Sequence, residues 1–183
     1  MPTLLEFQLP SGFCALDMSV AANSYGEFEF LIGGNEEFEI RAAEEFNDDE
    51  VDVLVSGYPY GDIYSNTVKV TKGIVSADRG IGDNSGRFQL DAAVQPGSSG
   101  GPIYDRNGNI VGVVVAQLNK LKIAKTIGSI PENVNFAIKV SMVRNFLTSN
   151  GISITPTNNS MPISTKDVAE IAKNQTVMVV CNP

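Results

Sequence analysis

The run that decides the fold is rich in glycine and serine: Asp91-Ala-Ala-Val-Gln-Pro-Gly-Ser-Ser-Gly-Gly-Pro102. Strand-like runs flank it at residues 87–90 and 110–116. The glycines permit backbone angles that a side chain disfavours, so the run predicts a tight loop. On such a loop the Ser99 hydroxyl would lie beside backbone amides, the arrangement that nucleophilic attack on a carbonyl requires. Taken alone, the run is also compatible with a plain turn between two strands.

Short apolar or alternating runs recur on both sides of this loop, separated by turn clusters such as Asn107-Gly108. Six short strands at near-regular spacing predict an all-β, antiparallel β-barrel. Apolar periodicity then predicts two C-terminal helices, at 141–150 and 166–174, the second opened by a capping box at Ser164. The expected strands are residues 51–55, 67–71, 73–77, 87–90, 110–116 and 134–138.

The loop and its strands resemble the chymotrypsin-like (trypsin-fold) serine proteases of the HtrA/DegP branch. Besides the loop, the turn Gly57-Tyr-Pro-Tyr-Gly61, the run Gly73-Ile-Val-Ser76 and the run Phe136-Ala-Ile138 follow the branch's order. The resemblance implies a complete second barrel with its closing helix over 51–150. Residues 1–50 would then be a remnant of a first barrel or a divergent segment. Residues 151–183 would form a linker, a helix and a terminal strand.

The resemblance also implies roles for particular residues. Ser99 matches the nucleophile, and the amides of Gly97 and Ser99 match the oxyanion hole. Asp17 resembles the aspartate of the catalytic triad, although a surface aspartate at a strand start is the alternative. A rival match puts Asn23 near the place of the histidine, at a spacing too short for an intact first barrel. Ser98 stands where the branch usually has asparagine.

The same resemblance implies a primary specificity pocket with an apolar wall. Because no carboxylate stands at Ala93, the pocket would take small or medium aliphatic side chains rather than Lys or Arg. The valines expected in this wall, at positions 113–115, are equally compatible with a barrel core. Strand alternation lets only half of them face a pocket. The expected lining is Ala93, Val113, Val114, Val115 and Ala116.

The 183 residues contain no histidine. A Ser-His-Asp triad needs an imidazole as its base, because a hydroxyl is a poor nucleophile at neutral pH without one. We therefore expect a truncated, inactive form of a trypsin-like endopeptidase. The alternative is a catalytically dead module that binds extended peptides or serves a structural role. Lys72 or a histidine supplied by a partner are the first places to look for another base.

The net charge of −8 argues against nucleic acid and anionic membranes as partners. The resemblance implies a polypeptide substrate or an extended peptide as the partner. Acidic side chains crowd residues 27–52, and we expect a solvated surface there rather than a calcium site. We expect no cofactor, no metal and no membrane span, and the oligomeric state stays open. Cys14 and Cys181 could pair in an oxidising compartment or remain buried thiols. No signal peptide is visible, and the resemblance implies a periplasmic or secreted protein.

Overall fold

The computed structural model describes residues 21–22, 28–29, 52–60, 67–117, 133–151 and 159–176. They belong to two compact units, one of Met1–Glu39 with Val177–Pro183 and one of Ile40–Thr176. In the first unit, β1 (Ala21–Ala22) pairs antiparallel with β2 (Phe28–Glu29). Asp17, Asn23, both cysteines and the expected terminal strand beyond Thr176 lie outside the described residues.

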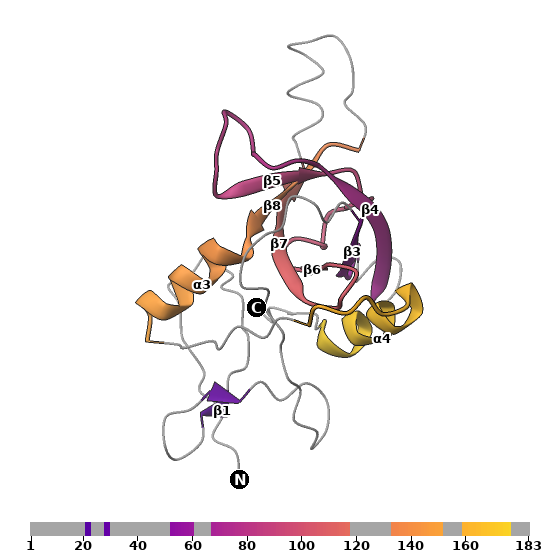
Figure 1. Cartoon of the computed structure of the whole chain (residues 1–183). Coiled ribbons are helices and arrows are strands. Elements are labelled where there is room, and N and C mark those ends of the chain that lie inside the picture. The colour runs from indigo at the N-terminus through magenta and orange to yellow at the C-terminus, as the bar shows by residue number, and fades with distance from the viewer. Residues whose placement is uncertain are drawn as a thin grey trace. The chain divides into compact units, whose positions relative to one another are not determined.

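The second unit contains a closed, six-stranded antiparallel barrel in the order β3-β4-β5-β8-β7-β6, which confirms the predicted fold class (Figure 1). The barrel closes where β3 meets β6, with Leu54 opposite Tyr104 and Val55 opposite Ile103. The strands are β3 (Asp52–Gly57), β4 (Lys69–Ala77), β5 (Arg87–Leu90), β6 (Pro102–Tyr104), β7 (Ile110–Gln117) and β8 (Asn135–Lys139).

The runs 67–71 and 73–77 form one continuous strand, β4, which passes through Gly73. A β-carbon on Gly73 would collide with the backbone of Ala92, so glycine here allows two backbone segments of the chain to approach closely. Next to this contact, Asp91 Oδ1 accepts a hydrogen bond from the Ile74 N–H at 2.6 Å. The three-residue strand β6 was absent from the prediction.

The barrel interior is filled by apolar side chains from most strands and from the loop before Ser99, including Phe88, Leu90 and Val114. Strand β3 is buried on both faces, which explains why its sequence reads as a continuous apolar run. Val53 and Val55 belong to the interior cluster. Leu54 belongs to a second cluster, outside the barrel, with the C-terminal helix.

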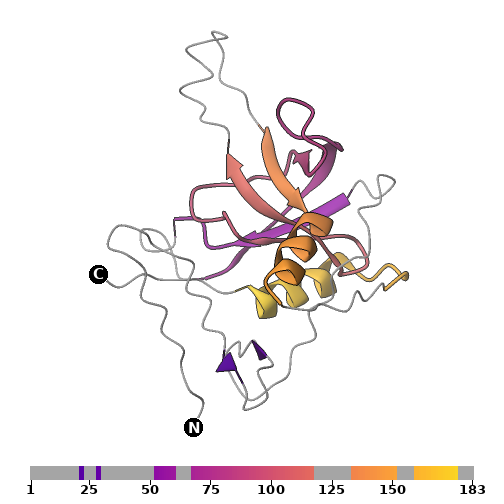
Figure 2. The same ribbon diagram turned by 90° about the vertical axis from the view of Figure 1, so that its left-hand side faces the viewer.

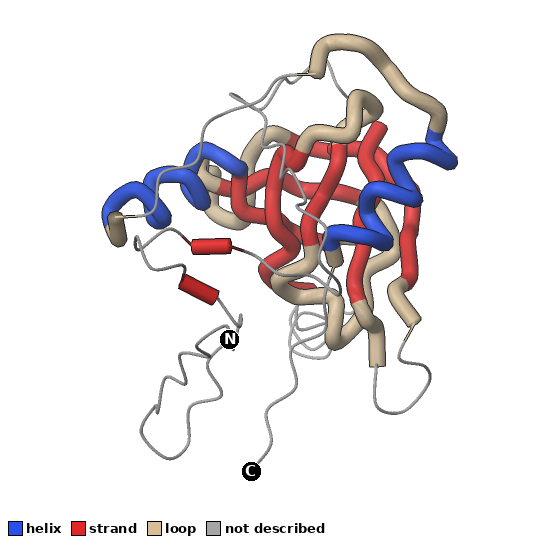
Figure 3. Tube along the Cα trace, turned by 90° about the horizontal axis from the view of Figure 1, so that it is seen from below, coloured by secondary structure: helices blue, strands red, loops and turns tan. Residues whose placement is uncertain are grey.

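Both predicted helices form, and they pack on the outside of the barrel (Figures 2 and 3). Helix α3 (Val140–Ser149) contacts β7 and β8, and helix α4 (Thr165–Gln175) contacts β3, β4 and β6. The predicted cap at Ser164 is confirmed, because its hydroxyl accepts the Asp167 N–H at 3.2 Å. Neither of the two described helices has the length and apolar content that a membrane crossing requires.

Candidate active site

The loop that carries Ser99 depends on glycines in left-handed conformation. Gly97 has φ +94° and Gly100 has φ +86°, angles that residues with a β-carbon rarely adopt. A β-carbon on Gly97 would also lie 2.5 Å from the carbonyl oxygen of Tyr58. Between these two glycines the chain presents Ser99 to solvent and turns Ser98 inward, where it is only 6% exposed.

The segment before the loop is held by two side chains from neighbouring strands. The Asn135 amide donates to the carbonyl oxygen of Ala92 at 2.7 Å, from β8. The Thr71 hydroxyl donates to the carbonyl oxygen of Ala93 at 2.9 Å, from β4. These bonds fix two consecutive peptide units from two sides, so the barrel wall sets the path of the chain that leads to Ser99.

The loop itself is closed by backbone hydrogen bonds. The Ser98 N–H donates to Gln95 O at 2.9 Å, and the Gly101 N–H donates to Ser98 O at 3.0 Å. Gly100 N–H donates to Val114 O at 2.8 Å, and Val114 N–H donates to Gly101 O at 2.9 Å. The end of the loop is therefore paired with β7.

Between residues 97 and 101, the amides of Gly97 and Ser99 differ from those of their neighbours. Within the described part of the chain, neither N–H has a hydrogen-bond partner, whereas the amides of Ser98, Gly100 and Gly101 all have one. Both residues are exposed to solvent. Two unsatisfied donors flanking a buried residue, beside an exposed hydroxyl, can receive an oxygen atom that develops negative charge.

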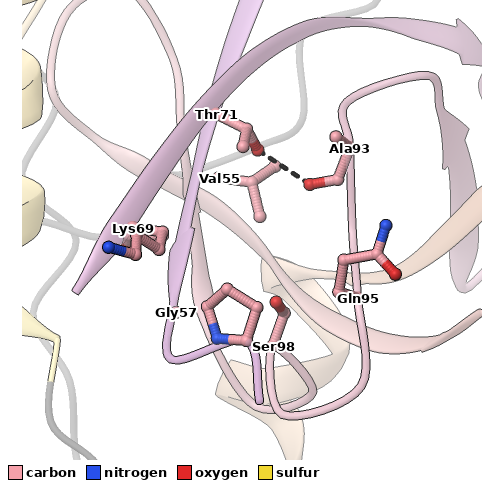
Figure 4. A pocket seen from close by; sticks show the side chains of 9 residues that line it. Val55, Gly57, Lys69, Thr71, Ala93, Gln95 and Ser98 are labelled. Atoms are coloured by element: carbon pink, nitrogen blue, oxygen red, sulfur yellow. Dashed lines mark hydrogen bonds between the residues drawn. The ribbon is translucent and has the colours of Figure 1, made fainter. Parts of the chain in front are cut away.

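A small pocket of about 80 Å³ lies behind the loop, between the loop, β3 and β4 (Figure 4). Ser98 and Ala93 are among the residues that line it. The valines of β7 do not line this pocket. Its lining is Val55, Ser56, Gly57, Pro59, Lys69, Thr71, Ala93, Gln95 and Ser98.

The valines of β7 that were expected to line the specificity pocket alternate between buried and half-buried positions, as a strand requires. Val114 is 1% exposed and packs in the barrel interior, so its side chain cannot line a substrate pocket. Val113 and Val115 are half-buried, and the pairing with β8 is irregular between Val114 and Ala116. Such a bulge re-aims the side chain at its extra residue, here Val115. The side chain of Ala116 lies outside the described residues.

Lys72, the suggested alternative base, lies on β4, and three residues that support the loop were not predicted from the sequence. The Lys72 ammonium pairs with Asp52 Oδ2 at 2.8 Å across β3 and β4. The buried position of Ser98 and the anchoring roles of Thr71 and Asn135 were not foreseen. Only the asparagine before the Phe136 run offered a signal, because a polar residue there interrupts an apolar strand. No group of three or more metal-binding side chains occurs among the described residues.

Comparison with known proteins places these features in a family. Residues 4–113 match the model of the trypsin-like peptidase domain, which is more than half of the chain. The chain belongs to the trypsin-like peptidase family. The match reaches from the N-terminal segment past the Ser99 loop and into β7.

Several relatives carry protease names. Protease Do-like 2, chloroplastic, of Arabidopsis thaliana is 35% identical over 102 residues, covering 52% of this chain and 15% of the relative. Serine protease HtrA-like of Staphylococcus haemolyticus is 37% identical over 103 residues, covering 50% and 15%. Uncharacterized protein y4bJ of Sinorhizobium fredii is 39% identical over 129 residues, covering 70% and 20%. The matched part of the chain thus spans a fifth or less of these relatives.

Proposed function

We propose that this chain provides the nucleophile and the oxyanion hole of a serine endopeptidase of HtrA type. Ser99 Oγ attacks the carbonyl carbon of a peptide bond, and the electron pair of the carbonyl moves onto its oxygen. The N–H groups of Gly97 and Ser99 then donate to that oxyanion. The observation that supports this assignment is that, among the described residues, the amides of Gly97 and Ser99 have no hydrogen-bond partner, whereas those of Ser98, Gly100 and Gly101 have one.

The proton of Ser99 needs a base that these 183 residues do not provide. The sequence has no histidine, carboxylates are too acidic, and the Lys72 ammonium pairs with Asp52. In a serine protease of another fold, loss of the histidine lowers turnover by about 10⁶. We propose that the chain by itself does not turn over peptides and that hydrolysis requires an imidazole from outside it. Asp17 would orient that imidazole.

The proposed substrates are polypeptides with a small or aliphatic side chain at the cleavage site. Ala93 offers no carboxylate to pair with Lys or Arg, and Val113 and Val115 remain partly accessible on β7. One extra methylene changes binding in an apolar pocket only modestly, so we expect a class of side chains to be accepted rather than one. A periplasmic or secreted location is part of the same proposal.

A peptide boronic acid tests the nucleophile and the oxyanion hole without needing the missing base. Ser99 Oγ forms a bond to trigonal boron, its proton leaves to solvent, and boron becomes a tetrahedral anion that resembles the reaction intermediate. We expect an acetyl-Ala-Ala peptide ending in the boronic analogue of valine to bind the parent at least about tenfold more tightly than Ser99→Ala. The arginine analogue should bind more weakly.

The matching peptide amide serves as control, since it has no boron, and both proteins should bind it equally. Equal binding of the boronic acid by the parent and Ser99→Ala would contradict the assignment of Ser99. Hydrolysis of casein by the parent, lost in Ser99→Ala, would contradict the proposed need for an external base.

The missing histidine also favours a second candidate, a module that binds extended peptides without cleaving them. In that case the parent and Ser99→Ala would bind the peptide amide equally, and the boronic acid would bind no better than the amide. The same titrations therefore separate the two candidates.

A further inference from the structure

Helix α4 is packed tightly against the outside of the barrel wall that carries the Ser99 loop. Val168 and Ala172 are fully buried there, in one cluster with Leu54 of β3 and Tyr104 of β6. Figure 1 shows α4 alongside these strands. Burial of this apolar face holds the helix in place, and its last turn then lies at the end of β3.

A chain of hydrogen bonds joins that last turn to β3. The Thr176 hydroxyl donates to Ala172 O at 2.6 Å, and Thr176 Oγ1 lies 2.6 Å from Ser56 Oγ. Since the threonine hydroxyl has one proton, the Ser56 hydroxyl is the donor to Thr176. The Tyr58 hydroxyl donates to Thr176 O at 3.1 Å. One residue at the end of α4 thus bonds two residues of the segment 56–58.

The segment 56–58 is in turn the support of the Ser99 loop. A β-carbon on Gly101 would collide with the carbonyl oxygen of Ser56, and one on Gly97 would lie 2.5 Å from that of Tyr58. The two backbones therefore lie against each other with no room for a side chain. A displacement of Ser56 or Tyr58 must be transmitted to the loop, because packed interiors do not absorb such shifts.

The start of the C-terminal segment is also tied to the barrel. The Asn159 N–H donates to Asn109 Oδ1 at 3.1 Å, and the Asn109 side chain donates to Asn159 O at 3.0 Å. The Asn159 side chain donates to Asn107 O at 3.0 Å, in the turn between β6 and β7. Residues 159–176 are thus bonded to the barrel at both ends.

We propose that residues 159–176 belong to the active-site scaffold and that Thr176 is a positioning residue for the oxyanion hole. Thr176 acts through Ser56 and Tyr58 on the amides of Gly97 and Ser99. Buried hydroxyl pairs contribute little net stability compared with apolar packing, but they specify one geometry. The inference rests on the proposed function, because it gives the C-terminal segment a role at that site.

Thr176→Val tests the proposal, because it removes the hydroxyl and keeps the branched shape. We expect the boronic acid to bind about tenfold more weakly to this variant, since small misplacements of catalytic groups have large effects. Binding of the peptide amide should change less than about twofold. Thr176→Ser, which retains the hydroxyl, should restore the affinity of the parent. All titrations are made where thermal unfolding shows each variant to be folded.

Ser164→Ala is the matched control. The Ser164 hydroxyl accepts the Asp167 N–H at 3.2 Å at the start of α4, so the variant weakens the same helix far from Thr176. We expect the ratio of boronic acid to amide affinity to stay within about twofold of the parent. An equal loss in Ser164→Ala and Thr176→Val would mean that Thr176 acts only by stabilising α4. Unchanged boronic acid affinity in Thr176→Val would overturn the proposal.

Amide hydrogen exchange examines the loop without any ligand, and it remains informative if Ser99 proves not to bind the boronic acid. The Ser98 and Gly100 amides are bonded within the loop and to β7. We expect them to exchange at least about fivefold faster in Thr176→Val than in the parent and Ser164→Ala. Unchanged exchange in Thr176→Val would overturn the positioning role whatever the boronic acid result.

Discussion

Replacing Gly97 by alanine perturbs both the backbone angle and the packing of the Ser99 loop. The backbone has φ +94° at this position, and left-handed conformations cost an L-residue about 1–2 kcal/mol. The added methyl also lies 2.5 Å from Tyr58 O and 3.1 Å from Tyr60 N, so the turn at 58–60 must move. Overpacking of this kind costs about 1–3 kcal/mol. The expected loss in the free energy of unfolding is about 2–5 kcal/mol.

Gly82→Ala isolates the first of these effects. Gly82 has φ +67°, yet a β-carbon there has no atom within 4 Å. This variant should lose about 1–2 kcal/mol. Both substitutions reduce the entropy of the unfolded chain to the same extent, so that contribution cancels in the comparison. The difference of about 1–3 kcal/mol between them measures the contact with the Tyr58 turn.

Urea unfolding followed by circular dichroism provides the free energies, with unchanged m-values as the condition for comparing midpoints. We also expect Gly97→Ala to weaken boronic acid binding at least about tenfold, because it displaces one oxyanion donor. Equal stability of Gly97→Ala and Gly82→Ala would contradict the close contact between the loop at Gly97 and the backbone of Tyr58. The assignment of the Gly97 amide to the oxyanion hole would then lose its structural support.

Two further predictions concern the barrel and α4. Burial raises the pKa of Tyr104 well above its usual value, so the fold keeps a proton that the unfolded chain releases above pH 10. The free energy of unfolding should fall as the pH rises above about 10, by up to about 1.4 kcal/mol per pH unit. It should fall less steeply in Tyr104→Phe. Urea unfolding at several pH values measures this, and equal slopes of the free energy against pH in the two proteins would contradict it. Val168→Ala should lose about 2 kcal/mol, whereas Phe146→Ala, at a side chain 68% exposed, should lose under about 0.5; similar midpoints would argue against the packing of α4.

Much of the loop could be predicted from sequence because its requirements are local. A run with three glycines around Ser99 needs unusual backbone angles, and Gly97 and Gly100 adopt them. The cap at Ser164 was recognisable for the same reason, since donor and acceptor are three residues apart. Strand β5 was predicted with its observed bounds, Arg87–Leu90, from its alternating pattern.

The features that depend on distant partners could not be predicted. Strand β6 has three residues, too few for a periodic pattern, and it exists because β3, some fifty positions earlier, closes the barrel against it. Ser98 is buried because the loop turns it toward β3, although its neighbours in sequence are exposed. The bond between Ser56 and Thr176 joins residues 120 positions apart. Sequence therefore determined the backbone chemistry of the Ser99 loop, whereas only tertiary packing decided which side chains hold it, because those contacts form when the barrel closes and α4 covers it.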